Sequence, residues 1–107
     1  MTVYVCQLPC KFINGQFVQT RNVNAASKYG EIKEVCQPSF SIASLSPVKE
    51  SVEKILSKFN PEVDFLLPIG DPLIIAKCIF VLSKKHKSFR VLKWNKKTQS
   101  YSTHCVY

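Results

Sequence analysis

The spacing of hydrophobic positions changes along the chain, and the change separates predicted strands from predicted helices. Residues 2–8 (TVYVCQL) are rich in β-branched and aromatic side chains, and residues 31–37 (EIKEVCQ) alternate, so each predicts a strand. Residues 64–69 (DFLLPI) are nearly all apolar, as expected for a strand with both faces covered. Residues 89–94 (FRVLKW) and 101–107 (YSTHCVY), joined by a polar turn, predict a C-terminal hairpin.

The segment after the second predicted strand has the period of an amphipathic helix. Apolar residues recur at i, i+4, i+7, i+8 and i+11, namely Val48, Val52, Ile55, Leu56 and Phe59. Ser46 suits the N-cap because its oxygen accepts a backbone N–H, and Pro47 suits the first helical position because it has no N–H. Asn60-Pro61 is expected to end this helix.

The segment Gly70-Asp71-Pro72 lies where the third strand ends and a second helix begins. Asp71 suits the N-cap and Pro72 the first position of a helix over residues 73 to about 86. Strand ends of this kind are also where open α/β sheets bind ligands. A single glycine does not form a phosphate-binding loop, and an aspartate at the cap repels anions. We therefore favour a structural corner, and a ligand or metal site at Gly70, Asp71 and Pro72 is the alternative.

Residues 10–30 have no clear period. An Asn14-Gly15 pair between short apolar runs indicates a β-hairpin. Residues 22–30 (NVNAASKYG) are typical of a loop that contains a short helical turn.

The predicted order is β-β-α-β-α-β-β, and strands that alternate with helices imply a mostly parallel sheet. The C-terminal hairpin adds an antiparallel edge. The 107 residues have the length of one domain, residues 1–107. We expect an α/β fold, a small sandwich with about four or five strands and two helices.

The number of cysteines and the hydropathy of the chain indicate the cellular compartment in which the protein works. The five cysteines are an odd number: Cys6, Cys10, Cys36, Cys78 and Cys105. Residues 1–5 have the pattern of a strand, without the basic start of a signal peptide, so we expect reduced thiols in a cytoplasm. The uninterrupted part of the longest apolar stretch is shorter than the roughly 20 residues that a membrane span needs, so we expect no membrane role.

The net charge of +8 is concentrated in the last third of the chain. All seven acidic residues lie within residues 1–71, where seven Lys and Arg balance them. Residues 72–107 contain eight Lys and Arg and no acidic residue. An asymmetry of this kind indicates an anionic partner.

Cations and aromatic residues alternate in residues 84–101 (KKHKSFRVLKWNKKTQSY). Lysine and arginine attract phosphates, and aromatic side chains offer a face on which bases stack. We expect the cations to converge on one exposed patch. The alternative is a solvated lysine surface around a hairpin in which Trp94 belongs to the core. The candidate nucleic-acid-binding residues are Lys84, Lys85, Lys87, Arg90, Lys93, Trp94, Lys96, Lys97 and Tyr101.

Other chemistry has little support in the sequence. A zinc site would have to draw on Cys6, Cys10, His86, His104 and Cys105, which contain no second close pair of ligands. Buried reduced thiols are the simpler interpretation. Neither a Cys–His pair nor paired carboxylates occur in a recognisable pattern. We therefore expect that the protein is not an enzyme and that it binds neither a metal ion nor a cofactor.

Several short motifs resemble a family of small proteins of tailed bacteriophages. The matching residues are 29–32 (YGEI), 64–67 (DFLL), 70–72 (GDP), 92–95 (LKWN) and Tyr101, after an opening strand (TVYVCQ). The sequence departs from the family pattern at Asn95, where an acid is common, and at Lys77 and Cys78, in a helix usually rich in alanine. The resemblance implies expression in the cytoplasm of an infected bacterium and brings no particular activity.

Three functions follow as hypotheses. The first is a non-enzymatic accessory protein that binds nucleic acid through residues 84–101. The second is a host-takeover or anti-defence factor whose basic surface meets an acidic host protein. The third is a small-molecule or nucleotide binder at the Gly70-Asp71-Pro72 corner. A homodimer through an edge strand is compatible with each of them.

Overall fold

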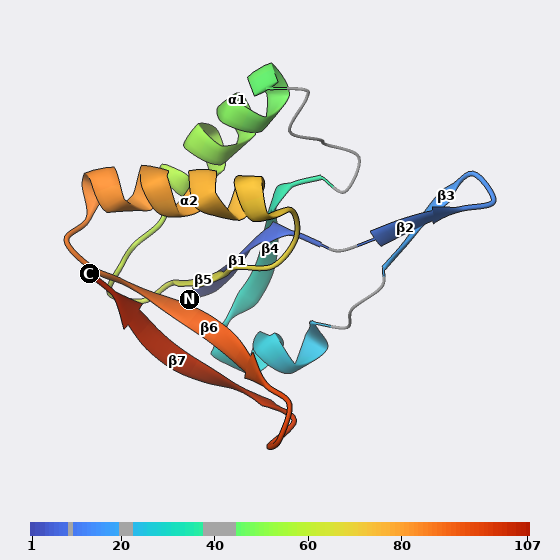
Figure 1. Ribbon diagram of the computed structural model, residues 1–107. Coiled ribbons are helices and arrows are strands. Elements are labelled where there is room, and N and C mark those ends of the chain that lie inside the picture. The colour runs from blue at the N-terminus through green and yellow to red at the C-terminus, as the bar shows by residue number, and fades with distance from the viewer. Residues whose placement is uncertain (9, 20–22, 38–44) are drawn as a thin grey trace.

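The computed structural model of the chain describes residues 1–8, 10–19, 23–37 and 45–107 (Figure 1). The α/β class and the two main helices agree with the sequence prediction. In chain order the elements are β1 (Thr2–Gln7), β2 (Cys10–Ile13), β3 (Gln16–Gln19), the 3₁₀ helix η1 (Asn24–Tyr29), β4 (Glu31–Cys36), α1 (Leu45–Leu56), β5 (Phe65–Leu67), α2 (Pro72–Lys85), β6 (Phe89–Asn95) and β7 (Ser100–Val106).

Five of the strands form one sheet in the order β4-β1-β5-β6-β7. Strands β4, β1, β5 and β6 are parallel, and β7 runs antiparallel to β6. This is the mostly parallel sheet with a C-terminal antiparallel edge that the sequence predicted. The chain therefore places the carboxyl ends of β1, β5 and β6 along the same side of the molecule.

Strands β2 and β3 form a separate antiparallel hairpin, which projects away from the five-stranded sheet (Figure 1). Its turn consists of Asn14 and Gly15, with φ angles of 51° and 77°. Positive φ at both central residues is what a two-residue type I′ turn requires, and Asn-Gly is its preferred sequence. The hairpin predicted from this pair is thereby confirmed.

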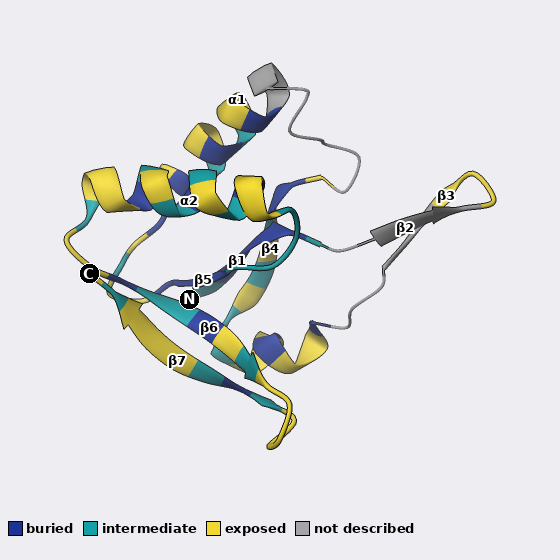
Figure 2. Ribbon diagram, viewed as in Figure 1, coloured by how far each residue is buried: buried dark blue, intermediate teal, exposed yellow. Residues whose placement is uncertain are grey.

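Both α helices lie on one face of the sheet, and η1 lies on the other (Figure 1). Because successive residues of a strand point to opposite faces, β1 contributes Tyr4 and Cys6 to the core under the helices and Val3 and Val5 to the core beside η1. Figure 2 shows β1 and β5 as the buried centre of the sheet. Burial on both faces explains why the sequence of β5 is a continuous apolar run.

Strand β5 is shorter than the sequence predicted, and polar groups at its two ends explain the difference. Before it, the buried Asp64 carboxylate accepts hydrogen bonds from the backbone N–H groups of Thr2 (2.9 Å) and Asn60 (2.8 Å). The Asp64 carboxylate thus joins the loop before β5 to the first residue of β1. After Leu67, Pro68 has no N–H to donate to a neighbouring strand.

Helix α1 begins earlier than predicted, because Leu45 is already helical and Ser46 therefore lies inside the helix. Pro47 is tolerated there because the N–H groups of the first turn have no partner within a helix. The helix ends at Leu56, and the Phe59 N–H donates to the Leu56 carbonyl (3.1 Å) in the turn that follows. Phe59 remains part of the core under the helices.

In the part of the chain that the structure describes, neither helix has the length and apolar character that crossing a bilayer requires.

Candidate nucleic-acid interface

Strand β6 continues beyond the end of its neighbour β5, and this difference in length opens a groove. The two strands are paired at Phe65–Arg90 and Leu66–Val91. On the other side, β6 remains paired with β7 as far as Asn95–Ser100. After Leu67 the chain turns through Pro68 into α2, so the last part of β6 has β7 on one side and a loop on the other.

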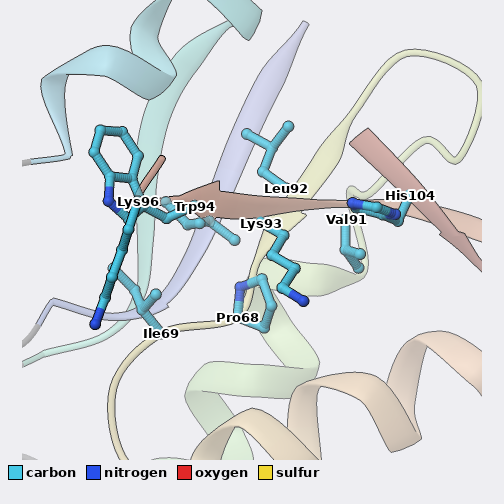
Figure 3. Close-up of a pocket in the computed structure, with 9 residues that line it drawn as sticks. Pro68, Ile69, Val91, Leu92, Lys93, Trp94, Lys96 and His104 are labelled. Atoms are coloured by element: carbon cyan, nitrogen blue, oxygen red, sulfur yellow. The ribbon is translucent and has the colours of Figure 1, made fainter. Parts of the chain in front are cut away.

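The first hollow of the groove has a volume of about 540 Å³ and a mostly apolar lining. In Figure 3, Lys93 extends beside Pro68 on one side of β6, whereas Leu92 points to the other side. The loop after β5 therefore forms one wall and β6 the other. The lining residues are Leu67, Pro68, Ile69, Val91, Leu92, Lys93, Trp94, Lys96 and His104.

A second hollow of about 480 Å³ adjoins the first and is more polar. It shares Lys93, Trp94, Lys96 and His104 with the first, and we call the two together the β6 groove. Among the residues named as lining either hollow, none is acidic. The second hollow is lined by Lys93, Trp94, Asn95, Lys96, Lys97, Ser102 and His104.

The turn between β6 and β7 holds two of these lysines in place. The Asn95 side-chain oxygen accepts from the backbone N–H of Lys97 (2.9 Å), and the Gln99 side chain donates to the Lys96 carbonyl (2.8 Å). Gln99 itself has a φ of 53°, which closes the turn. A side chain that bonds its own turn limits the conformations of the backbone. Lys96 and Lys97 therefore leave the hairpin from a defined position.

Trp94 and Tyr101, both predicted to bind bases, have different roles. Their rings meet at 4.9 Å between centroids with an interplanar angle of 66°, an edge-to-face contact. Tyr101 is only 5% exposed, and its carbonyl accepts a hydrogen bond from the Tyr29 hydroxyl (2.9 Å). Tyr101 is thus a core residue that supports Trp94, whereas the half-buried Trp94 lines both hollows.

His104 was not predicted as part of this site. It lies on β7 opposite Val91, and its Nε2 atom is 2.9 Å from the Ser102 hydroxyl oxygen. Pro68 and Ile69, which form the opposite wall, were also missed. No signal in the sequence predicted this wall, because the two predicted strands, residues 64–69 and 89–94, have the same length.

The predicted cations are spread from the end of α2 to the turn after β6. Lys84 and Lys85 end α2 and Lys87 precedes β6, whereas Lys93 lies within β6 and Lys96 and Lys97 follow it. At about 3.3 Å per residue, Lys93 lies roughly 13 Å along the strand from Phe89, and the end of the strand at Asn95 lies roughly 20 Å from it. This placement does not support a single convergent surface over residues 84–101, and the binding of nucleic acid by these cations stays a prediction.

Arg90 lies between these groups and has structural partners. Its guanidinium donates to the Glu62 carbonyl (2.7 Å) and lies over the Phe65 ring, 4.2 Å from the centroid. A guanidinium held by a carbonyl and an aromatic face is less available to a phosphate. Arg90 therefore ties β6 to the loop before β5.

The Gly70-Asp71-Pro72 corner has the geometry of a helix cap. The Asp71 carboxylate accepts from the Leu73 N–H (2.8 Å), and Pro72 is the first residue of α2. On the other side, the Gln7 side chain accepts from the Asp71 N–H (3.3 Å), and the Gln7 N–H donates to the Ile69 carbonyl (3.1 Å). These bonds join the end of β1 to the start of α2.

The described cysteines divide into a buried group and an exposed one. Cys6, Cys36 and Cys78 are buried in the core under the helices, and Cys105 is exposed on β7. Burial raises the pKa of Cys36 to about 11, and a hydrogen bond with Cys78 together with burial raises that of Cys6. Within the described residues no three His, Cys, Asp or Glu are placed to hold a metal ion, and the Cys10 side chain lies outside them.

A family model described as phage Pam3 gp32-like protein matches residues 1–107. The chain therefore belongs to this phage protein family, in agreement with the resemblance found in its sequence. The searches of the curated proteins and of the solved structures found no significant match.

Proposed function

We propose that this member of a phage protein family is a non-enzymatic accessory protein that binds single-stranded nucleic acid in the β6 groove. The observation that carries the proposal is the lining of the two hollows. Three lysines, a histidine and the only tryptophan of the chain surround them, and no acidic residue is among the lining residues. Such a combination suits a ligand that is anionic and aromatic at once.

The two hollows differ in a way that matches the two parts of a nucleotide. The first is mostly apolar, because Pro68, Ile69 and Leu92 line it together with Trp94, and this suits an unpaired base. The second adds Lys97 and the polar Asn95 and Ser102 to the lining that it shares with the first, and this suits a phosphate. A base within a duplex is stacked and paired, so the apolar hollow favours a single strand.

Location and charge are consistent with this role. The carboxyl ends of parallel strands are where α/β sheets commonly bind ligands. Reduced thiols fit a protein that works in the cytoplasm of the infected cell, as its family would imply. The third hypothesis, a ligand at the Gly70 corner, has less support because Asp71 already caps α2.

The test uses the single tryptophan as a reporter. A single-stranded oligonucleotide added at low ionic strength is expected to quench Trp94 fluorescence, because a stacked base lies against the indole. With about three phosphate contacts, the logarithm of the binding constant should fall with the logarithm of salt with a slope of about −2. A duplex of the same sequence should bind more weakly and quench less.

A matched pair of variants separates the groove from net charge alone. Lys96→Glu/Lys97→Glu and Lys84→Glu/Lys85→Glu change the net charge by the same amount at opposite ends of β6. We expect the loss of affinity for the single strand to be about tenfold or more greater in Lys96→Glu/Lys97→Glu than in Lys84→Glu/Lys85→Glu. Equal losses in the two variants, or no quenching by any single strand at low salt, would overturn the proposal.

A further inference from the structure

The outer side of α2 is apolar where a surface helix is usually polar. Ile74, Cys78 and Leu82 are buried and hold the helix against the sheet. Leu73 and Phe80, two turns apart on another side of the helix, are 56% and 63% exposed. Large apolar side chains that are exposed beside cations on one side of a helix are typical of a surface that binds a partner. Neither exposed residue lines the β6 groove.

A small hollow lies beside Phe80, between the two α helices. Its volume is about 140 Å³, which is room for an apolar side chain. Lys84 Nζ is 5.1 Å from the centroid of the Phe80 ring, so a cation stands directly over the exposed aromatic. The lining residues are Lys49, Val52, Glu53, Lys77, Phe80, Val81 and Lys84, of which three are cationic and one is acidic.

We propose that this surface, which we call the α2 surface, binds an acidic amphipathic segment of another protein. An apolar side chain of the segment would fill the hollow beside Phe80, and carboxylates beside it would pair with Lys49, Lys77 and Lys84. The combination of an exposed aromatic anchor with surrounding cations is what such a segment needs. The inference does not depend on nucleic-acid binding.

Charge and shape favour this occupant over two others. A second copy of the chain, docked through the same surface, would bring the lysines of both copies together, and like charges at an interface are costly. A bilayer of anionic lipid would be attracted to the lysines, but the hollow is concave and accepts a protruding side chain.

The probe is a set of synthetic helical peptides with leucine along one side and either Glu, Gln or Lys beside it. Backbone amide NMR shifts of the full-length protein report where each peptide binds. We expect the Glu peptide to shift the residues that line the hollow, and to bind roughly tenfold more tightly than the Lys peptide at low salt. The Gln peptide should lie between them.

Two variants complete the test. Phe80→Ser should weaken the binding of the Glu peptide by about tenfold or more. The melting temperature of the protein should stay nearly unchanged, because the Phe80 side chain is largely exposed. Lys96→Glu/Lys97→Glu should leave peptide binding intact, since neither residue lines the hollow.

Three results would overturn the inference. The first is equal binding of the Glu and Lys peptides, or no binding by the Glu peptide. The second is a dimer in sedimentation experiments that Phe80→Ser converts to monomer, because the surface would then be covered by a second copy. The third is binding to phosphatidylserine vesicles that Phe80→Ser abolishes, while the Glu peptide shifts no residue of the hollow.

Discussion

At the strand–helix corner, the backbone conformation and the space around residue 70 both favour glycine. Its φ angle is +112°, a value that residues with a Cβ rarely adopt. A Cβ at this position would also come within 2.6 Å of the Gln7 carbonyl oxygen. Both restrictions arise because the corner passes directly over the end of β1. Glycine is therefore required here by close backbone approach, independently of any ligand.

Gly70→Ala should accordingly be more destabilising than an alanine at another glycine with positive φ. Gly15 is the matched control, because its φ is +77° and an added Cβ would meet nothing within 4 Å. We expect Gly15→Ala to cost about 1 kcal/mol of unfolding free energy from backbone strain alone, and Gly70→Ala to cost about 3 kcal/mol or more. Urea unfolding measures both, and equal costs would contradict the role of the Gln7 contact.

The buried thiols allow a prediction about reactivity and pH. Because only a thiolate is alkylated and the pKa of Cys36 is about 11, Cys36 should be nearly inert at pH 8, as should the raised-pKa Cys6. Cys105 is exposed and should react quickly. Iodoacetamide labelling, read residue by residue by mass spectrometry, tests this. Labelling of Cys36 as fast as Cys105 in the folded protein would contradict the assigned burial.

At the level of a single element, α2 depends on its N-terminal cap. The Asp71 carboxylate satisfies the Leu73 N–H, which would otherwise lack a partner in the first turn. Asp71→Ala should lower the unfolding free energy by about 1 kcal/mol, whereas Asp71→Asn, which keeps an acceptor oxygen, should lower it by much less. Denaturant midpoints of the two variants measure the difference. If Asp71→Asn lowered the unfolding free energy as much as Asp71→Ala, the helix would need the negative charge of the carboxylate as well as an acceptor oxygen.

Strand β6 illustrates what the sequence could predict and what it could not. The sequence predicted the strand itself and its hairpin with β7, because both depend on neighbouring residues. The cap of α2 was predicted for the same reason. The engagement of Arg90 with Glu62 and Phe65, and the burial of Tyr101 under Trp94, depend on residues distant in the chain. The groove itself follows from a difference in strand length, which residue type alone does not reveal.

The whole molecule carries a net charge of +8, and all of the excess comes from residues 72–107. Like charges on one compact chain repel each other, and salt screens this repulsion over about 10 Å at 0.1 M. We therefore expect the melting temperature to rise between low and physiological salt. A gain of about 0.5 kcal/mol would correspond to roughly 2–4 °C for a domain of this size.

The same measurement on Lys96→Glu/Lys97→Glu provides the control. With fewer like charges to screen, this variant should melt higher than the parent at low salt and respond less to added salt. A melting temperature of the parent that falls with salt would mean that attractive charge pairs outweigh the repulsion.

The projecting hairpin of β2 and β3 offers a practical consequence. Its Asn14-Gly15 turn stands apart from the five-stranded sheet and is solvent-exposed (Figures 1 and 2). Exposed turns of this kind are where proteins best accept inserted sequence. An epitope or a fluorogenic tag placed between these two residues should leave both cores assembled. The protein could then be followed inside an infected cell without altering either surface proposed to bind a partner.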